Sequence, residues 1–250
     1  MPVMTVGTGR ALIPTGINYN DLVMGTGPIA YWPLWETSGT VAHCLVNPLQ
    51  DGTYNSDVSG WPPGTGIGDG NTAPTFDGIN DAVAISTATL AAAYDGEELS
   101  LMVWSRADDW VSGVTLFKLC GKNFAPVDRF FIQKNNTNDR FEYFHIGSSV
   151  TVALSEGNGQ ASVVWRCAVM TVSKIANQSK GYVDAAQVGV TGVGLGAWGR
   201  PGILVANETA IGASSLIPLA GQWKGGLAHV ALWDRVLAQP EITELFSLIP

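Results

Sequence analysis

The chain has 250 residues, of which 46% are hydrophobic and 14% are charged, and it includes 30 Gly, 13 Pro and nine Trp. This composition excludes a disordered chain, which would have few hydrophobic residues and many charges, and a long coiled coil, which would have few Gly and Pro. The formal net charge is −8 and the basic residues form no cluster, so we expect neither nucleic acid nor a membrane as a partner.

Most of the chain has the pattern of short strands. Residues 1–18 show no apolar period and are predicted to form an N-terminal arm, followed by one domain over residues 19–250. Short runs rich in β-branched and aromatic residues then alternate with Gly, Asn, Asp and Pro. The clearest runs are Leu99–Arg106, Phe130–Gln133, Arg140–Ile146, Val163–Val172, Tyr182–Val188, Ile203–Ala206, Thr209–Ile211 and His229–Trp233. Many short strands without intervening helices predict an antiparallel sandwich or barrel.

Only two segments have a helical pattern. Ser86–Tyr94 is long enough for one or two turns. Gln239–Leu248 has Pro near its start and Glu241 early, as the helix dipole favours. The Gly-rich residues 188–202 are predicted to form a long surface loop. Asp77–Asp81 is predicted to be a tight hairpin turn.

Several motifs together resemble a known family. In chain order they are Ile29–Ala42 (IAYWPLWETSGTVA), Asp51–Tyr54 (DGTY), Thr75–Ile85 (TFDGINDAVAI), Leu99–Arg106 (LSLMVWSR), Trp165, Gly181–Val188 (GYVDAAQV), Ile211–Ala213, Trp223–Leu237 (WKGGLAHVALWDRVL) and Pro240–Ile242. This order resembles the laminin-G-like, concanavalin A-like lectin/glucanase jelly-roll family over about residues 19–248. The resemblance implies an all-β antiparallel sandwich with a short C-terminal helix, in which relatives bind glycans on the concave face of one sheet.

Catalysis is not expected from this sequence. Glucanase-type relatives need carboxylates spaced as Glu-x-Asp-x-x-Glu or Glu-x-Asp-x-Glu on one strand, and that spacing is absent. Gly-x-Ser-x-Gly and His-Glu-x-x-His motifs are absent as well. The three cysteines, Cys44, Cys120 and Cys167, fit no zinc or redox motif and are predicted to be small buried residues.

Sugar binding needs an aromatic platform with polar groups that orient hydroxyls. The candidate glycan-binding residues are Trp104, Trp110, Tyr143, Trp198 and Trp223, whereas Trp32 and Trp165 occupy core positions of the family pattern. For each Trp, the alternative is packing in the core or at the rim.

The resemblance also implies Ca²⁺ near the rim of a sheet. The candidate ligands are Asp77, Asn80 and Asp81, with Asp51 behind them. The alternative is that these side chains cap turns through their own backbone. The acidic pair that the family has before its last strand is Ala228-His229 here, which favours the capping alternative.

Three functions follow from the resemblance. The opening Tyr19–Thr40 is similar to jelly-roll modules of bacteriophage virion proteins, which leave the cell by lysis, and the N-terminus has no Sec-type signal. The first hypothesis is a non-catalytic structural or adhesion protein of the virion surface, a capsid decoration or tail component. It would attach through the arm to other virion proteins or to its own oligomer, and bind a cell-surface glycan.

The second hypothesis is a secreted, extracellular bacterial carbohydrate-binding lectin. The third is a glucanase-type glycosidase, against which the missing carboxylate pair argues.

Overall fold

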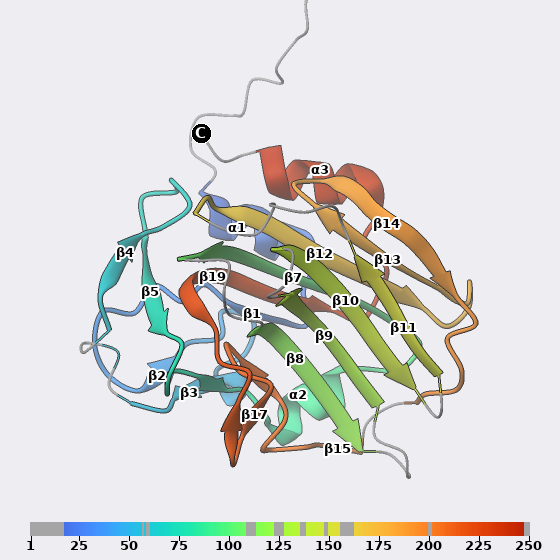
Figure 1. Ribbon diagram of the computed structural model, residues 1–250, viewed down its shortest axis with the longest axis horizontal. Helices are drawn as coiled ribbons and strands as arrows, with labels where there is room; N and C mark the ends of the chain where they lie inside the picture. The colour runs from blue at the N-terminus through green and yellow to red at the C-terminus, as the bar shows by residue number, and fades with distance from the viewer. Residues whose placement is uncertain are drawn as a thin grey trace, which may run out of the picture.

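The computed structural model describes residues 18–56, 58, 61–108, 114–122, 128–135, 139–147, 150–155, 163–199 and 202–247 (Figure 1). Its helices are α1 (Tyr19–Gly25), α2 (Ala88–Ala93) and α3 (Gln239–Ser247), with a short 3-10 turn η1 (Pro48–Gln50). Within these ranges, no helix combines the length and the apolar character that crossing a membrane requires. The predicted arm lies outside the described residues except for Asn18.

Two large antiparallel sheets form the body of the domain. Sheet A has the spatial order β14 (Ala186–Val193), β13 (Gln178–Val183), β12 (Arg166–Ser173), β7 (Glu98–Ala107), β19 (Lys224–Trp233), β5 (Thr72–Asp77) and β4 (Pro63–Thr65), and β1 (Ala30–Trp32) also pairs with β19. Sheet B has the order β11 (Val150–Ser155), β10 (Arg140–Gly147), β9 (Asp128–Asn135), β8 (Val114–Lys122), β16 (Ala210–Ile211), β6 (Val83–Ala84), β3 (Gly52–Tyr54) and β2 (Val41–Ala42), and β15 (Ile203–Leu204) pairs with β8. A small hairpin joins β17 (Ser215–Leu216) to β18 (Leu219–Ala220). The predicted β-sandwich is confirmed, and it is consistent with a jelly roll.

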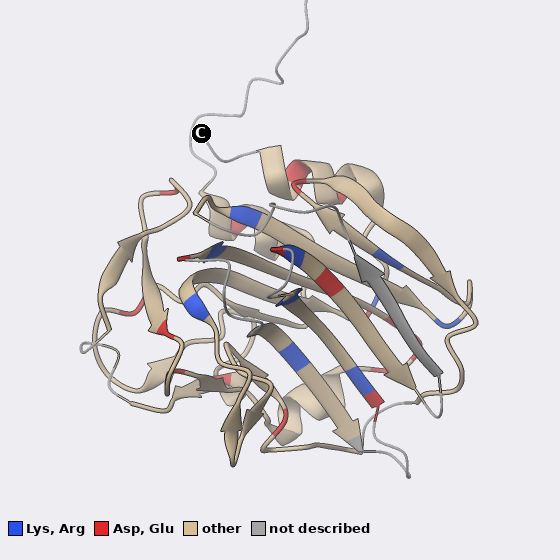
Figure 2. Ribbon diagram, viewed as in Figure 1, with Lys and Arg blue, Asp and Glu red and all other residues tan. Residues whose placement is uncertain are grey.

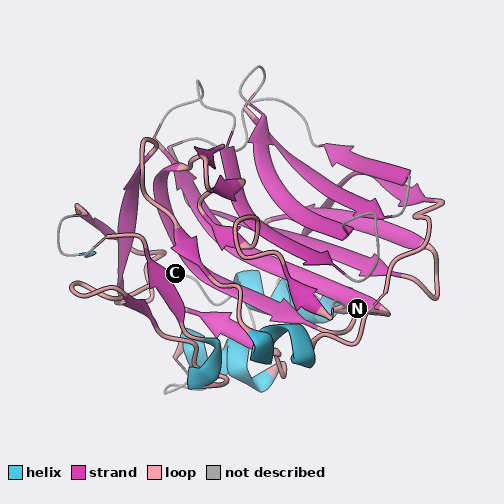
Figure 3. Cartoon of the chain, turned by 90° about the horizontal axis from the view of Figure 1, so that it is seen from below, coloured by secondary structure: helices cyan, strands magenta, loops and turns pink. Residues whose placement is uncertain are grey.

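Strand β7 shows how the sequence builds two cores. Leu101 and Val103 point between the sheets, where they join the main hydrophobic core, and Met102 and Trp104 point to the other side. That second side is also buried, because α1 and α3 cover the outer face of sheet A. Figure 3 shows the helices on the same side in that view, and Figure 1 separates them, with α1 and α3 together at the upper edge and α2 at the lower edge. Burying each large apolar side chain contributes about 1.5–3 kcal/mol, so both layers stabilise the domain.

The two predicted helices are confirmed as α2 and α3. Thr87 caps α2, because its Oγ1 accepts a hydrogen bond from the N–H of Leu90 at 3.0 Å. In α3, Glu241 reaches back to the N–H of Ala238 at 2.8 Å, and it also pairs with Arg235.

The structure differs from three sequence predictions. Residues 19–25 form helix α1 rather than part of a strand pattern: Asn18 Oδ1 caps it by accepting from the N–H of Asp21, and its apolar residues pack on sheet A. The predicted loop 188–202 begins as strand, because β14 pairs with β13 up to Val193. Asp77–Asp81 is a turn between the sheets and not a hairpin, because β5 belongs to sheet A and β6 to sheet B.

A buried polar network ties α1 to sheet A. The hydroxyl of Tyr31 lies 2.6 Å from both Asn20 Oδ1 and His229 Nδ1. On its other side, His229 Nε2 lies 3.1 Å from Asp69 Oδ2. Burial lowers the pKa of His229, an effect that Asp69 opposes. Burial raises the pKa of Asp69, but hydrogen bonds from His229 and Asn71 outweigh it and hold the pKa at about 2. His229, one of the two residues that stand where the resemblance implies an acidic pair, therefore has a structural role here.

Candidate functional site

The predicted glycan-binding aromatics are buried. The exposed fractions are 2% for Trp104, 0% for Tyr143, 6% for Trp198 and 0% for Trp223, and Trp110 lies outside the described residues. The four described side chains therefore form no exposed platform, and this expectation is corrected. The physical reason is that α1 and α3 cover the part of the outer face of sheet A that carries Trp104, and that Tyr143, Trp198 and Trp223 belong to the core between the sheets.

Each of these aromatics has a structural contact. Trp104 donates its Nε1–H to the hydroxyl of Tyr19 at 2.6 Å and stacks on Phe246 under α3. Trp223 donates Nε1–H to the carbonyl of Gly226 at 3.2 Å. These two hydrogen bonds satisfy the indole N–H groups of Trp104 and Trp223, which avoids the cost of burying them unpaired.

The predicted calcium ligands lie together in the turn between β5 and β6. Asp77 Oδ1 accepts from the N–H groups of Ile79 and Asn80, at 2.7 and 3.0 Å. Asp81 Oδ2 accepts from the N–H of Asp77 at 2.8 Å. Burial raises the pKa of Asp81 to about 6. The described residues contain no group of three or more His, Cys, Asp or Glu that could hold a metal ion. The contacts seen here cap the turn, and they do not by themselves supply the six to eight oxygens of a calcium site.

The outer face of sheet B carries a second group of polar and aromatic residues. Phe131 and Phe144 stack at 4.6 Å, and beside them Glu208 pairs with Lys118 and Arg129 at 2.8 and 3.0 Å. Figure 2 shows basic and acidic residues interspersed on β8, β9 and β10. Lys118, Arg129 and Glu208 already pair with one another, so these three charges are not free to bind a ligand.

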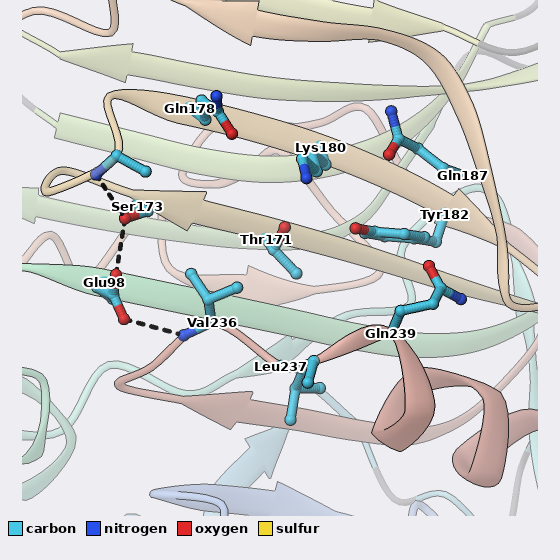
Figure 4. Close-up of a pocket in the computed structure, with 12 residues that line it drawn as sticks. Glu98, Thr171, Ser173, Gln178, Lys180, Tyr182, Gln187, Val236, Leu237 and Gln239 are labelled. Carbon is cyan, nitrogen blue, oxygen red and sulfur yellow. Dashed lines mark hydrogen bonds between the residues drawn. The ribbon is translucent and has the colours of Figure 1, made fainter.

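A groove on the outer face of sheet A is a better candidate (Figure 4). It has a volume of about 400 Å³ and lies over β12, β13 and β7, beside the start of α3. Its lining residues are Glu98, Thr171, Ser173, Ala176, Gln178, Lys180, Tyr182, Gln187, Val236, Leu237, Ala238 and Gln239. Grooves of this size hold small organic ligands. We call it the α3 groove.

The period of two along β13 builds the floor of the α3 groove. Gln178, Lys180 and Tyr182 alternate with other residues, so all three point out of sheet A. Thr171 and Ser173 of β12 also point out of sheet A, because Thr171 lies opposite Lys180 and Ser173 lies opposite Gln178 in the ladder. Burial raises the pKa of Tyr182, although a hydrogen bond with Thr171 opposes this.

The carboxylate of Glu98, held by two hydrogen bonds, closes one end of the α3 groove. Ser173 donates its hydroxyl to Glu98 Oε1 at 2.7 Å, and the N–H of Val236 points at Oε2 from 3.4 Å (Figure 4). Ser173 Oγ in turn accepts from the N–H of Ala176 at 3.0 Å. Glu98 therefore has a partner at each carboxylate oxygen.

Amides frame the other end. Gln239, the first residue of α3, donates to the carbonyl of Ala185 at 2.7 Å, which fixes its side chain at the rim. Gln187 is exposed and donates to Thr191 Oγ1 at 3.2 Å. The groove therefore offers amides, hydroxyls, one cation and the edge of an aromatic ring. These groups suit a ligand rich in hydroxyls.

The sequence analysis missed these residues, although one signal was present. The run Gln178, Lys180, Tyr182 places three polar or amphipathic residues on one face of a strand, next to a hairpin. Residues at the start of α3 form one side of the groove, and no local sequence pattern indicates where that helix packs on the sheet.

Comparison with known proteins gives consistent results. A family model described as the concanavalin A-like lectin/glucanases superfamily matches residues 76–243. No curated protein matches the sequence significantly. Among solved structures, Trypanosoma rangeli sialidase in complex with sialic acid is similar with a TM-score of 0.60 and 15% identity, covering 98% of this chain and 35% of that one.

Two further structures share the fold. Domain 4 of AbnA, a GH43 extracellular arabinanase from Geobacillus stearothermophilus, in complex with arabinotriose, has a TM-score of 0.61 and 12% identity, covering 87% of this chain and 97% of that one. The K499G mutant of NanB sialidase from Streptococcus pneumoniae has a TM-score of 0.53 and 14% identity, covering 71% of this chain and 27% of that one. The chain thus spans about a third of the sialidases, and at these identities the likeness shows the fold alone.

Proposed function

The chain belongs to the concanavalin A-like lectin/glucanase superfamily, and from this premise we propose that it is a non-catalytic carbohydrate-binding protein whose site is the α3 groove. The observation that carries the proposal is the lining of the groove, in which side-chain amides and hydroxyls from β12, β13, β14 and α3 converge on one volume of about 400 Å³. A sugar unit needs such fixed donors and acceptors. The arabinotriose bound to domain 4 of AbnA supports a sugar as the ligand.

The carboxylates of the groove support a role in binding rather than hydrolysis. Glycosidases use two carboxyl groups that flank the bond to be cut. Glu98 is the acid that lines the groove, and both of its oxygens already have hydrogen-bond partners. The virion-surface setting, with attachment through residues 1–18, stays a prediction.

A double variant tests the proposal. Gln178→Ala with Gln187→Ala removes two amides from the groove, and both residues lie on the sheet surface, so the fold is expected to survive. Each lost hydrogen bond costs about 1 kcal/mol, so we expect the affinity for a glycan to fall about tenfold or more. Gln222→Ala, a partly exposed glutamine outside the groove, is the matched control.

A glycan array identifies a ligand of the wild-type chain, and titration calorimetry compares the variants. Equal affinities of the double variant and the control would overturn the groove as the site. Failure of the wild type to bind any glycan would overturn the function. Release of reducing sugar from a bound oligosaccharide would overturn the non-catalytic role.

A further inference from the structure

Lys180 is the cation of the α3 groove, and it lacks a counterion among the described residues. The neighbouring bases all have one: Lys174 pairs with Glu97 at 3.0 Å, Arg235 pairs with Glu241 at 2.6 Å, and Arg166 pairs with Asp184. For Lys180, the described part of the chain supplies neither an ion pair nor a side-chain hydrogen bond, and it is partly exposed. A positive charge is therefore available to a ligand.

The acid of the groove does not neutralise this charge. Glu98 lies at the end of the groove that Ser173 and Val236 close, and these two residues occupy its oxygens. Lys180 lies between Gln178 and Tyr182 on β13, and no hydrogen bond joins it to the other residues drawn in Figure 4. Cation and acid thus act at separate places in the groove.

We infer that the α3 groove selects sugars that carry a carboxylate, such as uronic or sialic acids, and that Lys180 binds the carboxylate. This inference rests on the proposed function and adds the chemical class of the ligand. The ammonium of Lys180 donates to the carboxylate, the amide of Gln178 beside it donates to the same group, and Gln187 and Thr171 contact ring hydroxyls. A charge-assisted hydrogen bond is stronger than a neutral one, so it discriminates between acidic and neutral sugars.

The net charge of −8 does not prevent this binding. At physiological ionic strength, charges more than about 8 Å apart are largely screened, whereas a direct pair in a groove is screened much less. The affinity for an acidic sugar is therefore expected to fall moderately with added salt, and the affinity for a neutral sugar to stay constant.

The experiment compares paired probes on the full chain. Titration calorimetry with 3′-sialyllactose against lactose, and with trigalacturonate against galactotriose, measures the preference of the wild type. We expect at least one acidic probe to bind about tenfold or more tightly than its neutral partner. Lys180→Gln brings the affinity for the acidic probe down to that for its neutral partner, whereas Lys174→Gln, at a base that is already paired, keeps the difference.

The outcomes separate the two proposals. If neutral and acidic probes bind equally, or if Lys180→Gln weakens both to the same extent, the preference for a carboxylate is overturned and carbohydrate binding stands. If the wild type binds no probe of either kind and no glycan on an array, both proposals are overturned.

Discussion

The hydroxyl of Tyr143 on β10 donates a hydrogen bond to the backbone carbonyl of Tyr182 on β13, at 2.8 Å and across the two sheets. The preceding residue of β13 has no side chain where the tyrosine ring passes: a Cβ on Gly181 would lie 2.4 Å from Cδ2 of Tyr143. Tyr143 of sheet B thus fixes the position of β13, the strand that forms the floor of the α3 groove. The packing of the core and the geometry of the candidate site are therefore coupled.

Tyr143→Phe is therefore expected to affect both stability and binding. The change removes one buried hydrogen bond from a carbonyl that also lies in the β12–β13 ladder, which costs about 1 kcal/mol of the free energy of unfolding. Urea denaturation measures this cost, and calorimetry measures the accompanying loss of glycan affinity. Tyr54→Phe, which removes a hydroxyl bonded to Glu36 away from the groove, is the control: it is expected to lower stability without lowering affinity. A Tyr143→Phe protein with wild-type stability would show that the bond contributes nothing.

The turn between β13 and β14 offers a stabilising substitution. Asp184 and Ala185 have φ angles of 50° and 67°, in the left-handed region that Gly adopts without strain. Ala185→Gly relieves this strain, so we expect the free energy of unfolding to rise by up to about 1 kcal/mol. The carbonyl of residue 185 remains available to Gln239. Thermal melts of Ala185→Gly and of Ala176→Gly, where no positive φ is recorded, check the sign: only the first should be stabilised.

Buried His145 makes stability depend on pH. Its ring stacks on Phe130 at 4.8 Å, neither nitrogen has a hydrogen-bond partner in the part of the chain that the structure describes, and burial lowers its pKa from 6.5 to about 4. The unfolded chain binds the proton more readily, so the stabilising effect of a neutral His145 is complete above about pH 6.5 and is lost as the pH falls toward 4. Each unit of this shift corresponds to about 1.4 kcal/mol.

Two variants of His145 separate the effect of protonating the ring from the cost of burying its polar nitrogens. His145→Phe is expected to raise the melting temperature and to flatten the pH dependence between 6.5 and 4. His145→Gln also removes the titration, but it keeps unpaired polar atoms in the core, so it should flatten the profile without raising stability at pH 8. An unchanged slope in both variants would assign the pH dependence to other groups.

Calcium binding at Asp77, Asn80 and Asp81 stays a prediction with a direct test. If these residues bind the ion, it binds the native state alone and stabilises it by mass action, by about 2.7 kcal/mol at a concentration 100 times the Kd. Excess EDTA then lowers the melting temperature, calcium restores it, and Asp77→Asn abolishes the response. A melting curve that EDTA leaves unchanged would show that these carboxylates only cap the turn.

The sequence predicts the architecture well because the information is local. The alternation of Leu101 and Val103 with Met102 and Trp104 assigns β7 correctly to two faces, and the order of short motifs identifies the family. The proline and the early acid of α3 likewise mark a helix that the structure confirms. The three cysteines are buried, as predicted, and the structure shows all three as free thiols.

The candidate site is less predictable because it depends on packing between distant segments. Trp104 points away from the core between the sheets, but α3, more than 130 positions later in the chain, packs on it and buries it. Helix α1 was missed because a seven-residue helix has little periodicity of its own and is held mainly by packing. The start of α3 also forms one side of the α3 groove, and Lys180 on β13 stays partly exposed in that groove.

The hydroxyl that links Tyr19 of α1 to the carbonyl of Leu245 in α3, at 3.0 Å, has a mechanical consequence. The first and last described helices lie side by side on sheet A, so a force that pulls the two ends of the chain apart acts on this contact before it reaches the strands. We expect the helices to be released one contact at a time, because the load acts on single hydrogen bonds and packing contacts and not on a whole β-ladder. Under tension, we expect the domain to lengthen first by releasing α1 and α3, with the sandwich intact behind them.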